Sequence, residues 1–116
     1  MEAKQTLELF LRHAIKGHAR KAKKYVQITQ LHTSQLVDSN IERINLTLKG
    51  AGKITLVERE SVKTDLIPSK CLIDFKLVTE KKGEFTIRLI KESGIRKPDE
   101  NGTWGVNVTS FKIYTV

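Results

Sequence analysis

The stretch KCLIDFKLVTEKKGEFTIRLIKES, residues 70–93, alternates apolar and polar side chains on both sides of a short turn. The apolar parity is held by Cys71, Ile73, Phe75 and Leu77 in the first half and by Phe85, Ile87 and Leu89 in the second. A period of two is typical of a β-strand with one buried face. Because the connection 80–83 is short and contains a glycine, the two halves are predicted to form an antiparallel hairpin.

Two further strands are predicted outside this hairpin, at 53–63 (KITLVERESVK) and at 103–116 (TWGVNVTSFKIYTV). In the last segment the apolar parity changes between Val108 and Phe111, and a bulge near Thr109–Ser110 would account for the change. The intervening segments 64–69 and 95–102 both carry proline and aspartate, and they are predicted to be loops.

The N-terminal segment has a helical period instead. One arc of a helical wheel collects Ala3, Leu7, Phe10, Leu11, Ala14 and Ile15. Continuing this arc past Gly17 would bring Lys21 into the apolar face, so two helices, at roughly 3–16 and 18–27, are predicted to meet near Gly17.

The segment 31–52 allows two interpretations. Ser39-Asn40-Ile41-Glu42 matches a capping box, which favours a short helix that starts there. Ile44, Leu46 and Leu48 alternate with polar residues, which favours a strand that turns at 49–52. The strand is the favoured prediction.

Composition limits the class of protein. A chain of 116 residues with 39% hydrophobic and 29% charged side chains is predicted to be one globular domain, spanning 1–116. No apolar run approaches the ~20 residues that a membrane span needs. The N-terminus has no apolar signal-peptide region, so a cytoplasmic protein is expected, or an extracytoplasmic one if a leader is missing from this sequence.

The formal net charge is +8, and residues 1–30 hold seven Lys or Arg against two Glu, or +5 of it. Within this segment the second predicted helix carries a basic cluster of Arg20, Lys21, Lys23 and Lys24. Such a cluster could bind nucleic acid, or it could be the solvated side of an amphipathic helix, and it has no interleaved aromatic residues. Nucleic-acid binding is therefore kept only as a second alternative.

Helices followed by antiparallel strands predict an α+β fold. The segment TLELFLRHAIKGHARKAKKYV (6–26) resembles the opening of proteins of the nuclear-transport-factor-2-like superfamily, and GEFTIRLIKESG followed by GTWGVNV resembles its last two strands. His18 stands where many relatives have a capping aspartate. The resemblance implies a cystatin-like cone, with N-terminal helices packed on a curved, mostly antiparallel sheet, in a member of bacterial type.

The sequence contains no recognisable catalytic constellation. Asp74 has the opposite parity to the apolar face, so it is expected to be a solvated strand residue and not a general base. His13, His18 and His32 lack the spacing of a metal-ligand set, and neither a metal nor a cofactor is expected. Cys71 is expected to be an inert buried thiol.

Large apolar residues are predicted to line the interior of the cone: Phe10, Tyr25, Phe75, Ile87, Trp104 and Val106. They could form a filled core or a pocket for a small apolar ligand. The favoured function is a non-enzymatic binding or assembly domain, that is, a protein-interaction module. The resemblance implies a role like that of superfamily members that are scaffold subunits of conjugation and secretion machinery. The alternative is a small-molecule binder or an isomerase- or hydrolase-like enzyme that uses the pocket.

A homodimer through the outer sheet face is also expected. The parity opposite to the core still carries Leu72, Val78 and Ile90 beside Asp74, Lys76 and Arg88. A two-fold axis would let Asp74 of one chain meet Lys76 or Arg88 of the other. Ile90→Glu should then give a folded monomer, which light scattering would detect.

Overall fold

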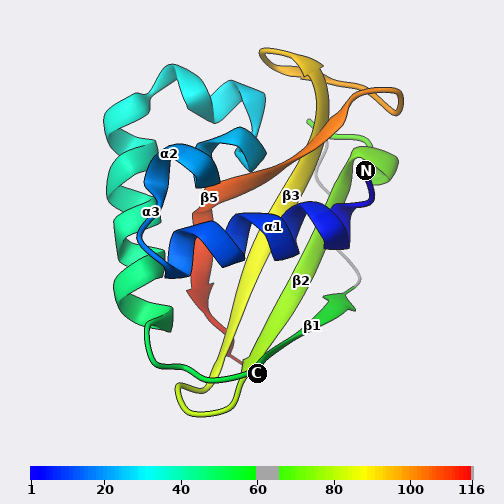
Figure 1. Cartoon of the computed structure of the whole chain (residues 1–116). Coiled ribbons are helices and arrows are strands. Elements are labelled where there is room, and N and C mark those ends of the chain that lie inside the picture. The colour runs from blue at the N-terminus through cyan, green and yellow to red at the C-terminus, as the bar shows by residue number, and fades with distance from the viewer. Residues whose placement is uncertain (60–65, 116) are drawn as a thin grey trace.

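The structure is a computed structural model that describes residues 1–59 and 66–115. Its helices are α1 (Ala3–Ile15), α2 (Ala19–Ala22) and α3 (Ser34–Leu48), with short 3₁₀ turns at Lys23–Tyr25, Ile28–His32 and Ser69–Cys71. The strands are β1 (Ile54–Arg59), β2 (Leu72–Thr79), β3 (Glu84–Gly94), β4 (Lys97–Pro98) and β5 (Thr103–Ile113). The helices pack on a strongly curled antiparallel sheet, which confirms the predicted α+β class and curved sheet (Figure 1).

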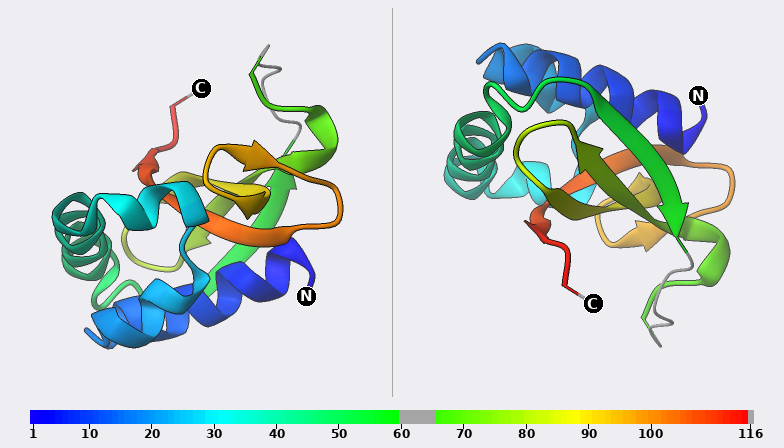
Figure 2. Two further views of the ribbon diagram at one scale, coloured as in Figure 1. Left: turned by 90° about the horizontal axis from the view of Figure 1, so that it is seen from above. Right: turned by 90° about the horizontal axis from the view of Figure 1, so that it is seen from below.

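The sheet is built around the long strand β3. Strands β1, β2 and β3 follow one another in antiparallel pairs, and β3 also pairs with β4 and with β5. Views from above and below show α1 lying across one face of the sheet, while α3 stands beside β5 (Figure 2). The predicted hairpin is confirmed, since Phe75 pairs with Ile87 and Leu77 with Phe85.

One core cluster joins the helices to the inner face of the sheet. Its buried members include Leu7, Phe10, Leu11 and Ala14 of α1, Val37, Ile41, Ile44 and Leu48 of α3, and Phe75, Leu77, Phe85, Ile87, Leu89, Val106, Val108 and Phe111 of the sheet. The first N-terminal helix and the break at Gly17 are confirmed, whereas the second α-helix is shorter than predicted and ends at Ala22, before the 3₁₀ turn Lys23–Tyr25. Gly17 has a φ of 78°, which glycine adopts without strain. No helix in the described parts of the chain is long and apolar enough to cross a membrane.

The favoured strand within 31–52 is wrong, because residues 34–48 form the helix α3. The buried positions Val37, Ile41, Ile44 and Leu48 are spaced by three or four residues, as a helix requires. Leu46 is 65% exposed, so the apparent alternation came from one solvent-facing leucine. The helix begins at Ser34, so the expected start at Ser39 is also wrong.

The predicted bulge in the last strand is confirmed. Thr86 pairs with Lys112 and Arg88 with Asn107, so Ile87 alone lies opposite residues 108–111. The expected loop 95–102 contains the two-residue strand β4. Strand β1 ends at Arg59, and the expected strand residues 60–63 and the first part of the expected loop 64–69 lie outside the described residues.

A buried carboxylate fixes the segment between α2 and α3 to the sheet. Glu92 of β3 is 3% exposed and accepts hydrogen bonds from Gln27 Nε2 (3.0 Å), from the Thr29 backbone N–H (3.1 Å) and from Thr29 Oγ1 (2.6 Å). The Gln27 N–H also donates to the Val106 carbonyl at 3.0 Å. Residues 27–29 therefore lie over one end of the outer sheet face.

A basic cleft on the outer face of the sheet

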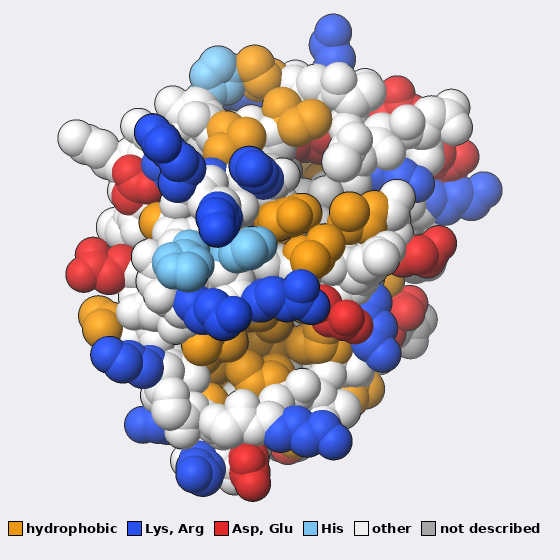
Figure 3. Space-filling view, viewed as in Figure 1, with side chains coloured by type: hydrophobic (Ala, Val, Ile, Leu, Met, Phe, Trp, Pro, Cys, Tyr) orange, Lys and Arg blue, Asp and Glu red, His pale blue; other side chains and the backbone are white. Residues whose placement is uncertain are grey.

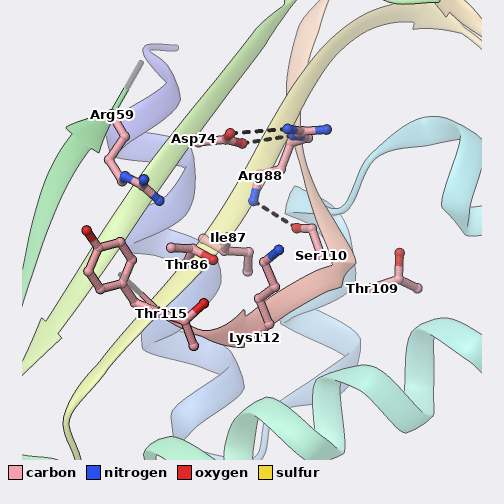
Figure 4. A pocket seen from close by; sticks show the side chains of 10 residues that line it. Arg59, Asp74, Thr86, Ile87, Arg88, Thr109, Ser110, Lys112 and Thr115 are labelled. Carbon is pink, nitrogen blue, oxygen red and sulfur yellow. Dashed lines mark hydrogen bonds and ion pairs between the residues drawn. The ribbon is translucent and has the colours of Figure 1, made fainter. Parts of the chain in front are cut away.

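The outer face of the sheet carries a cleft of about 480 Å³. Arg59, Asp74, Thr86, Ile87, Arg88, Thr109, Ser110, Lys112, Tyr114 and Thr115 line it. Asp74 and Arg88 alternate with the buried Phe75 and Ile87, so they project from the face opposite to the helical core. Figure 4 shows side chains from several strands converging above this part of the sheet.

The strand register explains why these residues meet. Arg59 pairs with Asp74, and Asp74 pairs with Arg88, which places the three side chains in one row across β1, β2 and β3. Thr86 and Lys112 pair in the row below it. The bulge in β5 brings Ser110 beside Arg88, whose backbone N–H donates to Ser110 Oγ at 2.8 Å (Figure 4).

Asp74 and Arg88 form a two-point ion pair. Arg88 Nε lies 2.8 Å from Asp74 Oδ1 and Arg88 Nη2 lies 3.2 Å from Asp74 Oδ2. The Asp74 side chain is 16% exposed, less than expected for a solvated strand residue, although its position on the outer face is confirmed. Hydrogen bonding to Asp74 raises the pKa of Arg88, so the guanidinium stays protonated.

The other cations in and beside the cleft form weaker contacts than Arg88. The Arg59 guanidinium lies 4.8 Å from the centre of the Tyr114 ring, and Lys76 Nζ lies 4.9 Å from it. Lys76 also pairs with Glu84 at 3.4 Å. Lys112 is exposed and has no ion-pair partner among the described residues. The described residues of the cleft lining include three cations and one carboxylate, a net charge of +2.

Two of the residues expected at a dimer face are not available there. Leu72 is 5% and Ile90 4% exposed, so both are buried within the chain. Ile90 pairs with Gly105, whose backbone contacts Gln27, and the segment 27–29 covers this end of the face. The substitution Ile90→Glu would therefore put a charge in a buried site and destabilise the fold instead of giving a folded monomer.

The remaining dimer-face residues are exposed only in part, and Asp74 and Arg88 already pair with each other inside one chain. Val78 is half-buried, and Val57 of β1, which is 42% exposed, pairs with Lys76. The outer face is thus more polar than its sequence pattern indicated, and the homodimer stays a prediction.

The residues predicted to line a pocket belong to the packed interior. Phe10, Phe75, Ile87 and Val106 are at most 1% exposed and lie within the core cluster. Tyr25 and Trp104 are half-buried and pack against it. Of the six, Ile87 is the one that borders the outer cleft.

The residues of the basic cluster and the histidines contact different parts of the structure. Lys23 pairs with Asp38 of α3, whereas the His13 ring lies against Tyr25. Burial raises the pKa of the Cys71 thiol, which is 1% exposed. Within residues 1–59 and 66–115, no group of three His, Cys, Asp or Glu side chains is placed to hold a metal ion.

The sequence analysis missed Arg59, Lys112, Ser110 and Tyr114 as parts of a site. A usable signal was present, since Arg59 and Lys112 are cations on the polar parity of predicted strands. Their convergence depends on strand order and on the bulge, which residue spacing does not reveal.

Comparisons with protein families, with curated proteins and with solved structures give no match. The resemblance to the nuclear-transport-factor-2-like superfamily therefore stays a prediction, and function has to be inferred from the geometry of the site.

Proposed function

We propose that this protein is a non-enzymatic interaction domain that receives an acidic segment of a protein partner in the outer-face cleft. The observation that carries the proposal is the convergence of Arg59, Arg88 and Lys112 in a cleft of about 480 Å³, where Lys112 has no ion-pair partner among the residues that the structure describes. Cationic side chains and hydroxyl groups bind carboxylates through charge-assisted hydrogen bonds.

A binding role fits the state of the one carboxylate in the cleft. Both oxygens of Asp74 accept hydrogen bonds from Arg88, so Asp74 is not free to remove a proton from a substrate. The packed interior around Phe10 and Phe75 likewise favours a binding surface over a catalytic pocket inside the cone. An assembly role, as in the scaffold subunits that the sequence resembles, and a homodimer through the same face are part of this proposal.

The first test measures binding of a fluorescein-labelled decapeptide of aspartate and glutamate by fluorescence anisotropy. We expect saturable binding that Lys112→Gln weakens by about fivefold, the effect of losing one charge-assisted contact of about 1 kcal/mol. Lys49→Gln removes the same charge from an exposed position just after α3 and is expected to change the affinity less than twofold. Equal losses in the two variants, or equal binding of an Asn/Gln peptide, would contradict the proposal.

A second prediction concerns the internal ion pair. Among the described lining residues Asp74 is the one carboxylate, so Asp74→Asn releases Arg88 and raises their net charge from +2 to +3. We expect the acidic peptide to bind at least about fivefold more tightly, because one unit of repulsion at about 4 Å is worth about 1 kcal/mol even in bulk water. Weaker binding by a variant with an unchanged circular dichroism spectrum would show that Asp74 helps to hold the partner.

A further inference from the structure

A second basic surface lies on the opposite side of the molecule, where α1 meets α2. Arg12 and Lys16 project from the last turn of α1 and the residue after it, and Lys21 projects from α2. All three are exposed. Figure 3 shows blue side chains gathered around two pale-blue histidines on this face of the molecule. We call Arg12, His13, Lys16, His18 and Lys21 the basic corner.

The side chains of the basic corner are close enough to influence one another. His13 is affected by Lys21 and His18, which follow the helix junction, and by Arg12 and Lys16, which lie before and after His13 in the chain. All of them are basic. Burial and, after it, these basic neighbours lower the pKa of His13. A bound polyanion would relieve this repulsion.

Aromatic rings lie within the same surface. The rings of His13 and Tyr25 are 6.1 Å apart and nearly parallel, at 6°, and the His18 ring centre is 6.5 Å from that of His13. His13 and Tyr25 are half-buried, so part of this short stack faces solvent. The sequence analysis found no interleaved aromatic residue, whereas folding places Tyr25 against a histidine from the preceding helix.

The surface lacks the features of a membrane-inserting patch. The large hydrophobic residues with high exposure among those described are Met1, Leu31, Leu36, Leu46, Val57, Leu66, Ile95 and Ile113. None of them falls between Arg12 and Tyr25, and Ile15 in this stretch is half-buried, so the basic corner offers charge and flat rings but no highly exposed aliphatic side chain to enter a bilayer.

We infer that the basic corner is a binding site for single-stranded nucleic acid, with phosphates held by Arg12, Lys16 and Lys21 and a base placed against the Tyr25–His13 stack. Cations that follow a backbone beside an exposed ring form the usual recognition pattern for single strands. This site is separate from the cleft proposed for the acidic partner.

The test measures anisotropy of a fluorescein-labelled 20-nucleotide oligothymidylate and of the matching oligouridylate, over a series of salt concentrations. Three phosphate contacts predict a slope of log affinity on log salt near −2, from about 0.7 per contact on a single strand. Lys16→Gln/Lys21→Gln should lower the affinity about tenfold or more and reduce the slope by about 1.4. Lys81→Gln/Lys82→Gln removes the same charge from the exposed β2–β3 turn and should change the affinity less than twofold.

Absence of binding at low salt, or equal losses in the two double variants, would overturn the inference. Binding of phosphatidylserine vesicles through the corner without binding of either oligonucleotide would overturn it as well. Tyr25→Phe should retain the affinity and Tyr25→Leu should lose about fivefold, the contribution of one modest stacking contact.

Lys112, on the outer sheet face, gives an independent readout. Lys112→Gln should leave oligonucleotide binding unchanged, so failure of this inference is distinguishable from failure of the proposed function.

Discussion

Glu92→Ala is expected to lower the free energy of unfolding by about 3–5 kcal/mol, a large part of the roughly 5–15 kcal/mol that a domain of this size has. Glu92 is 3% exposed and accepts three hydrogen bonds from Gln27 and Thr29. Removing the carboxylate leaves the buried amide of Gln27 and the donors of Thr29 without their acceptor. Urea denaturation followed by circular dichroism measures the loss.

Glu92→Gln serves as the matched variant, because it keeps the size of the side chain and one oxygen acceptor. Its cost should be about half that of Glu92→Ala, since one amide NH₂ group replaces an acceptor oxygen. A loss below about 1 kcal/mol for Glu92→Ala would mean that the segment 27–29 is not held by this carboxylate.

Gly105→Ala is the second substitution with a large expected effect, at least about 3 kcal/mol of destabilisation. A Cβ atom on Gly105 would lie 2.5 Å from Gln27 Cα and 2.7 Å from Gln27 N. Both atoms belong to the backbone, which a rotamer change cannot move away. We expect either a lower midpoint of urea denaturation or displacement of the segment 26–29 from β5, detectable by hydrogen exchange of the Gln27 amide.

Gly94→Ala is the control, in the same sheet. The nearest atom to a Cβ there is Lys97 Cδ at 3.4 Å, the middle of a flexible side chain. Its effect should stay within about 0.5 kcal/mol, as for an ordinary surface substitution. If the two glycine variants unfold at the same urea concentration, the close approach of Gln27 to β5 does not contribute to stability.

Local patterns predicted most of the secondary structure correctly. The hairpin from 70 to 93 is visible in the sequence because strand alternation and a short glycine-containing turn are properties of neighbouring residues. The break at Gly17 is visible for the same reason, since Lys21 cannot occupy an apolar helix face. The helix α3 was misjudged because Leu46, which is 65% exposed, imitates a strand position when its environment is unknown.

The two surfaces depend on residues that are distant in the chain. The cleft joins Arg59 of β1, Arg88 of β3 and Lys112 of β5, and only strand order and the bulge opposite Ile87 bring them together. The basic corner likewise needs the turn between α1 and α2 to place Tyr25 against His13.

By itself, the sequence determined the α+β class, the two N-terminal helices, the central hairpin, the bulge in the last strand and the parity of the inner sheet face. These follow from periodicity, which local burial imposes on neighbouring residues. Only the tertiary structure decided that Leu72 and Ile90 are buried, that Asp74 pairs with Arg88, and where the cations gather. The physical reason is that a strand's parity assigns a side chain to a face, whereas the segments packed over that face decide whether it meets solvent, a partner charge or the protein itself.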